Sequence, residues 1–246
     1  MFHPCVVIPV YNHEHAVGKV VARVLEHGLP CVLVDDGSSP ACAAALEALL
    51  ARHPGQLVLE RHAHNQGKGG AVLTGFARAR RDGYSHVLQV DADGQHNVAD
   101  IPRFLAAARA APAAVIAGCP VYDDSVPALR LYARYLTHVW VWINTLSLAI
   151  RDSMCGFRVY PVAPVVALAA RRRLGLRMNF DIEILVRLYW DGVDVVNLPT
   201  RVNYPEDGVS HFKAWTDNVL ITRLHVALFF GMLPRIPRLL ARRWRR

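Results

Sequence analysis

Five short apolar runs, each followed by a segment with helical periodicity, restrict the fold of this chain more than any other feature. The runs are rich in valine, as is typical of strands that are covered on both faces of a sheet. They occupy residues 5–10, 31–34, 57–59, 86–90 and 114–117. Strands that alternate with helices form βαβ units, so the sequence predicts an α/β fold with a mainly parallel central sheet flanked by helices.

Polar residues follow these runs directly, and ligands of parallel sheets bind beyond the carboxyl ends of the strands. Tyr11 and Asn12 follow the first run, Asp36 lies after the second, and Asp91 and Asp93 follow the fourth. Two carboxylates one residue apart suit a hard divalent cation, and such a cation suits a pyrophosphate. The sequence therefore predicts a nucleotide-diphosphate site at this edge of the sheet.

A glycine-rich loop at residues 65–70 follows the third run and opens a helix. Glycines at a helix N-terminus let an anion approach the backbone, and the helix dipole favours negative charge there. Lys68 would add a positive charge. The spacing matches neither the Walker loop nor the dinucleotide-binding loop. A simple turn is the alternative interpretation, and the neighbouring aspartates favour the anion site.

The cysteines indicate the cellular compartment of the protein. All five are scattered and show no Cys-x-x-Cys spacing, which argues for a reducing compartment and against a zinc site. The N-terminus shows no basic region followed by a long apolar stretch, so we predict no signal peptide. Only 20% of the residues are charged and 53% are hydrophobic, which excludes a disordered chain. We expect a cytoplasmic protein.

Five motifs in a fixed order carry a family resemblance. They are Pro9-Val10-Tyr11-Asn12, Asp35-Asp36-Gly37-Ser38, Asn65-Gln66-Gly67-Lys68-Gly69-Gly70-Ala71, Asp91-Ala92-Asp93-Gly94-Gln95-His96 and Asp152-Ser153-Met154-Cys155-Gly156-Phe157-Arg158. Over about residues 4–211 the chain closely resembles the family-2 glycosyltransferases of GT-A fold, especially the dolichyl-phosphate mannose synthase-like branch. The resemblance implies an inverting transfer from a UDP- or GDP-linked sugar, assisted by Mg²⁺ or Mn²⁺.

The resemblance also implies roles for individual residues. The residues implied to bind the nucleotide sugar are Pro9, Tyr11, Asn12, Asp36, Lys68 and Asp91. The implied metal ligands are Asp93, Gln95 and Asp91, with Asp93 also counted as catalytic. A cation that bridges the diphosphate oxygens would neutralise the charge that develops when the sugar–phosphate bond breaks.

The second half of the chain is expected to bind the acceptor. Arg130 and Arg134 are four residues apart on a predicted helix and share one face. The resemblance implies that arginines of this region hold the phosphate of a polyprenyl-phosphate acceptor, and a solvated basic face is the alternative. Asp152 is the candidate catalytic base for a hydroxyl acceptor. An orienting role is the alternative for Asp152, because a phosphate acceptor is already ionised.

The chain departs from the family pattern at two places. His13 follows Asn12 where the family often has glutamate. The family element Arg-x-x-Gly-x-Ser-Lys is matched by residues 205–211, which begin with proline and end with His211. The loss of two cations leaves a neutral lipid or another hydroxyl open as the acceptor. Arg201 and His211 remain candidate acceptor contacts.

The C-terminal segment raises the question of a membrane. Residues 219–233 are strongly apolar but are interrupted by Arg223 and His225, and they fall short of the ~20 residues that span a bilayer. An arginine-rich tail follows. We predict a GT-A domain at residues 1–212 and an amphipathic basic helical segment at residues 213–246. This segment is expected to lie on the anionic inner face of the cell membrane, with a packing helix and a solvated tail as the alternative. Nucleic acid is not an expected partner.

Two other classes of protein would share the parallel sheet. A sugar-nucleotide nucleotidyltransferase would carry a Gly-x-Gly-Thr-Arg-like loop after the first strand, and residues 9–12 are not that loop. A non-catalytic membrane-associated binding protein on a degenerate GT-A fold would have lost the metal aspartates, and Asp91 and Asp93 are both present. A glycosyltransferase is therefore the predicted function.

Overall fold

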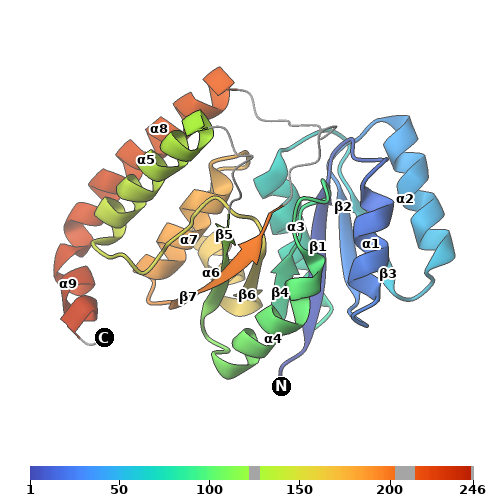
Figure 1. Cartoon of the computed structure of the whole chain (residues 1–246), viewed down its shortest axis with the longest axis horizontal. Coiled ribbons are helices and arrows are strands. Elements are labelled where there is room, and N and C mark those ends of the chain that lie inside the picture. Colours follow the sequence, from blue (N-terminus) through green and yellow to red (C-terminus); the bar gives the residue numbers. More distant parts are fainter. Residues whose placement is uncertain (122–127, 203–213, 245–246) are drawn as a thin grey trace.

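A seven-stranded sheet forms the centre of the computed structural model, which describes residues 1–121, 128–202 and 214–244 (Figure 1). The strands are β1 (Pro4–Val10), β2 (Cys31–Asp35), β3 (Leu57–Arg61), β4 (His86–Gln89), β5 (Val115–Val121), β6 (Arg158–Pro161) and β7 (Val195–Arg201). They are arranged in the order β3-β2-β1-β4-β6-β5-β7. The predicted α/β fold class is confirmed.

Helices cover both faces of this sheet. They are α1 (Val17–Leu25), α2 (Pro40–Arg52), α3 (Lys68–Arg81), η1 (Val98–Asp100), α4 (Ile101–Ala110), α5 (Ala128–Thr145), α6 (Val162–Arg171), α7 (Phe180–Trp190), α8 (Ala214–Met232), η2 (Leu233–Arg235) and α9 (Ile236–Trp244). In β1, Val6 and Ile8 join the core under α1, α2 and α4, whereas Cys5 and Val7 join the core under α3, α6 and α7. Because both faces are buried, the strand is apolar throughout.

Strand β6 interrupts the parallel sheet. The pairs β1–β2, β1–β4, β2–β3 and β5–β7 are parallel, and β6 runs antiparallel to both β4 and β5. All five strands predicted from the apolar runs are present, with ends that differ by a few residues. The sequence did not predict β6 and β7.

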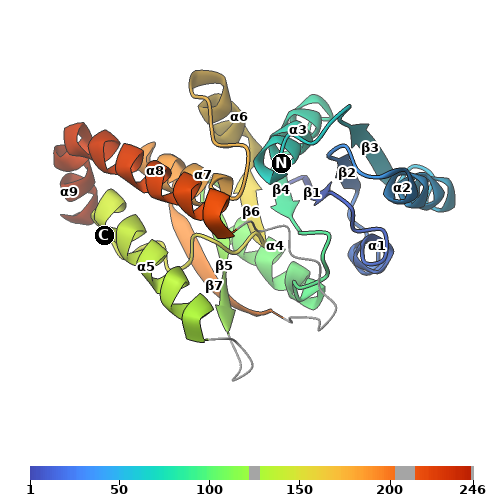
Figure 2. The same ribbon diagram turned by 90° about the horizontal axis from the view of Figure 1, so that it is seen from above.

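The C-terminal helices share the core of the domain. Leu224, Leu228 and Met232 of α8 are buried in the same cluster as the apolar residues of α7. Helices α5 and α8 lie side by side in both views (Figures 1 and 2). Arg242 of α9 packs against the domain, where its guanidinium donates to the main-chain oxygens of Tyr189 and Val193, and this contact argues against the alternative of a solvated tail at this residue.

The helical run at the C-terminus lies within the predicted helical segment 213–246 and extends beyond the apolar stretch 219–233 at both ends. It continues from Trp215 to Arg243 because the prolines of η2 and α9 occupy first-turn positions, where a missing N–H is tolerated. Among the described residues it is the one helix long and apolar enough to cross a membrane by length and composition. Packing helices of globular proteins also pass this test, so it does not decide between a span and a surface helix.

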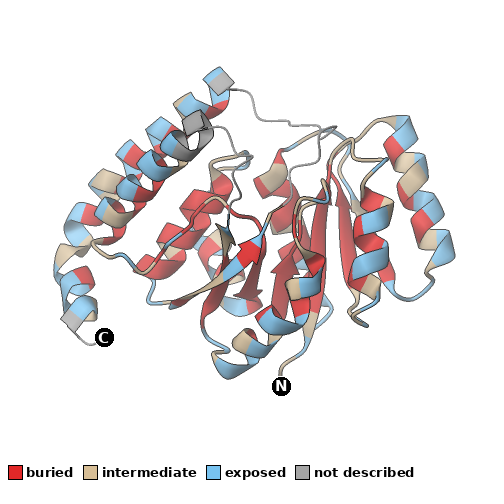
Figure 3. Ribbon diagram, viewed as in Figure 1, coloured by how far each residue is buried: buried red, intermediate tan, exposed pale blue. Residues whose placement is uncertain are grey.

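Helices α5 and α8 carry many exposed residues (Figure 3), and several of these are large and apolar. We call this set the outer apolar surface. Its members are Tyr132, Tyr135, Leu136, Val139, Trp140, Ile143, Val226 and Phe230. Large exposed apolar patches on protein surfaces often mark contacts with a lipid or protein partner.

Candidate active site

A pocket of about 1160 Å³ lies beyond the carboxyl ends of β1, β2 and β4. Eight of the residues predicted from the sequence line it: Pro9, Tyr11, Asn12, Asp36, Lys68, Asp91, Asp93 and Gln95. They come from four separate loops that the parallel strands bring to one edge of the sheet. The structure therefore brings the predicted nucleotide-sugar and metal residues together.

Other residues that line the pocket come from segments that the sequence analysis did not assign to the nucleotide-sugar site. Arg177 and Met178 precede α7, and Trp215, Asp217 and Arg223 belong to α8. They include two arginines that line the same space as the carboxylates. A pocket lined by both charge signs can hold an anionic group next to a cation.

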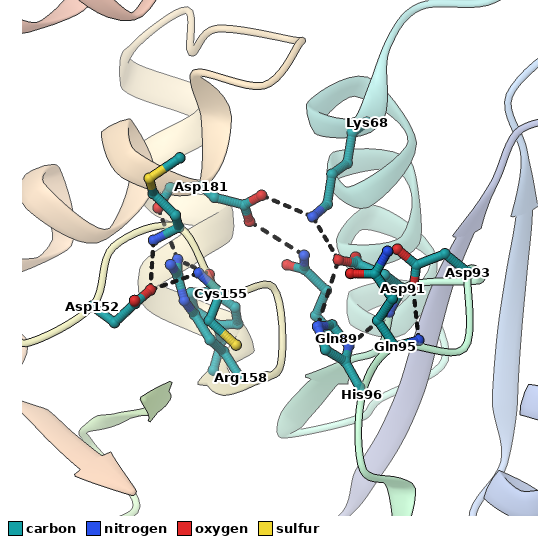
Figure 4. Close-up of polar contacts among 12 residues, drawn as sticks. Lys68, Gln89, Asp91, Asp93, Gln95, His96, Asp152, Cys155, Arg158 and Asp181 are labelled. Carbon is teal, nitrogen blue, oxygen red and sulfur yellow. Dashed lines mark hydrogen bonds and ion pairs between the residues drawn. The ribbon is translucent and has the colours of Figure 1, made fainter. Parts of the chain in front are cut away.

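Lys68 lies between two carboxylates at the base of the pocket (Figure 4). Its Nζ is 2.9 Å from Asp91 Oδ2 and 2.9 Å from Asp181 Oδ2. Burial alone would lower the pKa of Lys68, but Asp181 and Asp91 outweigh it and raise this pKa above its ordinary value. Burial alone would raise the pKa of Asp91, yet Lys68 and the nearby His96 hold it below its usual range. Lys68 and Asp91 are therefore both charged at neutral pH.

Asp91 has an oxygen that fits a metal ligand. Its Oδ1 is buried and has no hydrogen-bond partner, an expensive state for a carboxylate oxygen in a protein interior. Asp93 and Gln95 are held in the same loop, where Asp93 Oδ1 accepts the N–H of Gln95 at 3.0 Å. Two carboxylates and an amide oxygen suit Mg²⁺ or Mn²⁺, which retain several of their waters. The described residues contain no group of three or more His, Cys, Asp or Glu side chains placed to hold a metal.

Asp36 anchors the glycine-rich loop. Its Oδ1 accepts the N–H of Gln66 and its Oδ2 accepts the N–H of Gly67, both at 2.8 Å. Asn65 Nδ2 donates to Oδ2 at 2.9 Å, and His62 Nδ1 lies 2.7 Å from Oδ1. Asp36 lines the pocket as predicted, and its carboxylate also fixes the start of α3.

The backbone N–H groups of Gly69 and Gly70 are bound by another protein segment and do not face the pocket. The N–H groups of Gly69 and Gly70 donate to the main-chain oxygen of Leu176, at 2.8 and 3.3 Å. A Cβ on Gly67, whose φ is 98°, would lie 2.4 Å from the same oxygen. The glycines therefore allow close approach of a protein segment, whereas the sequence predicted close approach of an anion. The loop contributes charge to the pocket through Lys68.

Gly156 connects the fifth motif to the carboxylates. A Cβ at this position would lie 2.6 Å from Asp91 Oδ2 and 2.9 Å from Lys68 Nζ. Two residues later, Arg158 is fully buried, and its Nη1 donates to Tyr160 Oη and to the main-chain oxygen of Asp181. These contacts brace the strand that follows the fifth motif against the start of α7.

Asp152 is engaged by the protein on both oxygens. Oδ1 accepts the N–H groups of Met154 and Cys155, at 2.8 and 2.7 Å. Oδ2 lies 2.6 Å from Arg134 Nη2 and 3.4 Å from His138 Nε2. Burial alone would raise the pKa of Asp152, but His138 and Arg134 lower it far below its usual range. Such a carboxylate is a weak base, which favours the orienting role over the catalytic one.

The structure describes the side chains of only some of the predicted acceptor residues. Arg134 forms an ion pair with Asp152 on the inner side of α5. Arg130 lies in α5 without a described side chain, and His211 lies outside the described residues. Arg201 is exposed at the end of β7. Of these residues, the two with described side chains, Arg134 and Arg201, do not line the pocket that contains the carboxylates.

Asp181 is the main site residue that the sequence analysis missed. It is buried at the start of α7, where Gln89 Nε2 also donates to its Oδ1 at 3.3 Å. A signal was present, because this carboxylate lies in the first turn of a mostly apolar helical sequence. Its partner Lys68 is distant in sequence, so only the fold shows the pair.

The sheet topology and the position of the pocket define a GT-A-type glycosyltransferase. Residues 5–164 match the family described as Glycosyl transferase family 2, and the chain belongs to this family. The chain is 31% identical over 221 residues to polyprenol monophosphomannose synthase of Mycolicibacterium smegmatis, covering 83% of this chain and 79% of that protein. It is 32% identical over 173 residues to undecaprenyl-phosphate 4-deoxy-4-formamido-L-arabinose transferase of Pseudomonas aeruginosa, covering 68% of this chain and 49% of that relative.

Solved structures confirm the fold. Glucosyl-3-phosphoglycerate synthase of Mycobacterium tuberculosis, crystallised with Mn²⁺, UDP and glucosyl-3-phosphoglycerate, superposes with a TM-score of 0.64 at 15% identity, over 94% of this chain and 79% of that chain. Residues 1–349 of TarS from S. aureus, crystallised with UDP-GlcNAc, give a TM-score of 0.62 at 16% identity, over 92% of this chain and 66% of that chain. At these identities the likeness concerns the fold alone.

Proposed function

We propose that this family-2 glycosyltransferase moves a sugar, with inversion, from a nucleoside-diphosphate donor to a lipid acceptor and uses Mg²⁺ or Mn²⁺. The observation that carries the proposal is the buried, unpartnered Oδ1 of Asp91 beside Asp93 and Gln95 in a pocket that contains the predicted nucleotide residues. A cation held there would stabilise the negative charge of the departing diphosphate.

The donor would lie along the carboxyl ends of the strands. Pro9, Tyr11 and Asn12 line one end of the pocket and are proposed to contact the base and ribose. Lys68 and the metal loop line the base of the pocket, where the diphosphate would lie. The two structural neighbours that were crystallised with UDP or UDP-GlcNAc support a nucleoside-diphosphate donor.

The acceptor would approach along α8. Single-ligand pockets measure ~300–1,000 Å³. This pocket, at about 1160 Å³, is large enough for a nucleotide sugar and part of a second substrate. Arg177, Trp215 and Arg223, which also line it, offer cations and an exposed ring. The names of both curated relatives refer to polyprenol or undecaprenyl phosphate, which supports a polyprenyl phosphate acceptor here.

A hydroxyl acceptor is the second candidate, and the contacts of Arg134 favour it. The arginine that the resemblance assigns to the acceptor phosphate makes a close ion pair with Asp152. In this alternative the hydroxyl of a neutral lipid would replace the phosphate, and a base would be needed.

A membrane-surface location fits the position of the outer apolar surface. Helices α5 and α8 carry this surface, and the N-terminal part of α8 lines the pocket. The segment 213–246 is therefore proposed to contact the anionic inner face of the cell membrane while the catalytic domain stays in the cytoplasm. All five cysteines are free, which is consistent with a reducing compartment.

The first experiment measures nucleotide release from a panel of UDP- and GDP-sugars, with Mn²⁺ or Mg²⁺, by the wild type and by Asp93→Ala. We expect the wild type to release one nucleoside diphosphate slowly, and EDTA or the substitution to abolish the release. Donor binding measured by calorimetry covers the case in which turnover needs an acceptor. If every nucleotide sugar tested shows no turnover and no metal-dependent binding, the proposal is overturned.

The acceptor class is tested with the donor identified in this way. A polyprenyl phosphate and a polyprenol of equal chain length differ only in the phosphate, so they form a matched pair. Transfer to the phosphate alone would establish the first acceptor class, and transfer to the free hydroxyl alone would establish the second.

A further inference from the structure

The arrangement of Asp181, Lys68 and Asp91 raises an electrostatic problem for a metal site. Lys68 Nζ lies 2.9 Å from Asp91 Oδ2, so its ammonium would neutralise this carboxylate if the two formed an isolated pair. A neutralised carboxylate attracts a divalent cation weakly, and a nearby ammonium repels the cation. A lysine in this position is therefore unfavourable for metal binding unless a further charge offsets it.

Asp181 supplies that offsetting charge. Its Oδ2 lies 2.9 Å from the same Nζ, opposite Asp91 in Figure 4. Two carboxylates and one ammonium give Asp91, Lys68 and Asp181 together one net negative charge. Asp93 then adds a second negative charge on the metal side.

The surroundings of Asp181 hold its carboxylate in place. It lies in the first turn of α7, where the helix dipole favours a negative charge. Gln89, which is fully buried, donates to Oδ1, and Arg158 holds the main-chain oxygen of the same residue. Asp181 itself is buried and is absent from the lining of the pocket, so its influence on a ligand passes through Lys68.

We propose that Asp181 is a positioning residue for the transfer reaction: its carboxylate neutralises Lys68, so that Asp91 keeps its negative charge for the divalent cation. The inference rests on the proposed function, because it assumes a cation at Asp91. Lys68 in turn holds Oδ2 of Asp91, which leaves the unpartnered Oδ1 for the metal.

The test is the affinity for Mn²⁺ alone, followed by electron paramagnetic resonance of the free ion in the absence of nucleotide. We expect Asp181→Asn to weaken Mn²⁺ binding about tenfold, since an amide keeps the shape but not the charge. Lys68→Met should strengthen Mn²⁺ binding, and the double variant should return close to the wild type. The same titrations in the presence of UDP or GDP show whether the ranking of the variants by Mn²⁺ affinity is unchanged when a diphosphate is bound.

A purely structural role gives a different pattern. If Lys68 and Asp181 only hold Asp91 in position, Lys68→Met would weaken Mn²⁺ binding and the double variant would be worse than either single one. That pattern, or unchanged binding in Asp181→Asn, would overturn the inference and leave the proposed function standing. Failure of the wild type to bind Mn²⁺ with or without either nucleotide would overturn both.

Asp191→Asn is the matched control. Asp191 follows the other end of α7 and pairs with Arg171 at 2.8 Å, so the substitution removes the same charge from an arginine-paired aspartate remote from the pocket. We expect its Mn²⁺ affinity to equal that of the wild type. Thermal melts of all variants separate loss of charge from loss of fold.

Discussion

Gly156 lies where an added methyl group would collide with the ion pair between Lys68 and Asp91. We expect Gly156→Ala to lower the free energy of unfolding by about 1–3 kcal/mol, because the carboxylate must move to make room. Metal-dependent donor turnover should fall as well, because the same movement displaces the proposed metal ligand. Denaturant unfolding and the nucleotide-release assay measure the two effects.

Gly18 provides the control for that substitution. Its added Cβ would meet only Leu49 Cδ2, at 4.0 Å, and the residue lies within α1. Gly18→Ala should be neutral or stabilising by up to about 1 kcal/mol. Equal stability and activity of the two variants would show that Gly156 is not constrained by the ion pair.

Asp152 allows a test of orientation against catalysis. Asp152→Asn removes the charge that faces Arg134 in a largely buried pair, which typically costs about 3–5 kcal/mol of unfolding free energy. If Asp152 orients its loop, the surviving folded enzyme should keep the pH profile of the wild type. If Asp152 is the catalytic base, the acid limb of the profile should disappear together with transfer to a hydroxyl acceptor.

Spacing along the sequence was sufficient to predict Asp91 and Asp93 as one group, and the family resemblance added Gln95. These residues share a single loop after a buried strand, so their proximity does not depend on tertiary packing. Asp181 could not be assigned in this way, because its contact with Lys68 depends on how α7 packs against α3. The role of the glycines was misjudged for a similar reason, since Leu176 approaches them only in the folded chain.

Among the helices, the contact between α5 and α8 contains a buried polar pair. Asn144 Nδ2 lies 3.4 Å from His225 Nδ1, and Trp140 stacks on the His225 ring. Burial lowers the pKa of His225 from 6.5 to about 4. The neutral imidazole is therefore the form that fits between the helices.

This contact should make stability depend on pH. The unfolded chain binds a proton at His225 near pH 6.5, whereas the folded chain resists it until about pH 4, so stability is lost as the pH falls between these values. The loss at pH 4 should amount to about 2–3 kcal/mol. His225→Leu should flatten this part of the stability curve in denaturant unfolding from pH 7 to 4, and the exposed His15→Leu should not. A parallel fall in both variants would contradict the assignment.

The elements themselves differed in how far the sequence predicted them. Parallel strands with long apolar runs were recognisable because both of their faces are buried. Strand β6 has only four residues and begins with a buried arginine, so it carries no such pattern. The C-terminal helical run continues past the apolar stretch 219–233 because its prolines lie in the first turns of η2 and α9, where they do not end a helix.

For the chain as a whole, the outer apolar surface predicts binding to lipid vesicles. The exposed rings of Tyr135 and Phe230 lie on neighbouring helices, so replacing both by serine should weaken vesicle binding roughly tenfold or more. The fold should be little affected, because substitutions of exposed side chains usually change stability by less than about 0.5 kcal/mol. Flotation with phosphatidylglycerol and phosphatidylcholine vesicles measures the change and its dependence on lipid charge.

Val121→Ser is the control for vesicle binding, since this exposed residue lies at the end of β5 and outside the outer apolar surface. Equal binding of all variants would contradict a role of this surface in membrane contact. Self-association through the surface would instead appear as a mass that rises with protein concentration in light scattering and falls in the double variant.

The ribosome delivers the strands of this protein in a different order from the one they take in the sheet. Strand β4 is synthesised early, but the edge that pairs with β6 stays unpaired until β6 is synthesised. Strand β5 has no neighbour on either edge until β6 and β7 are synthesised. Open edges of apolar strands can pair with other chains. Nascent chains that stop before residue 158 should therefore aggregate or engage chaperones, and the stretch between β4 and β6 sets how long each new molecule is exposed to that risk during translation.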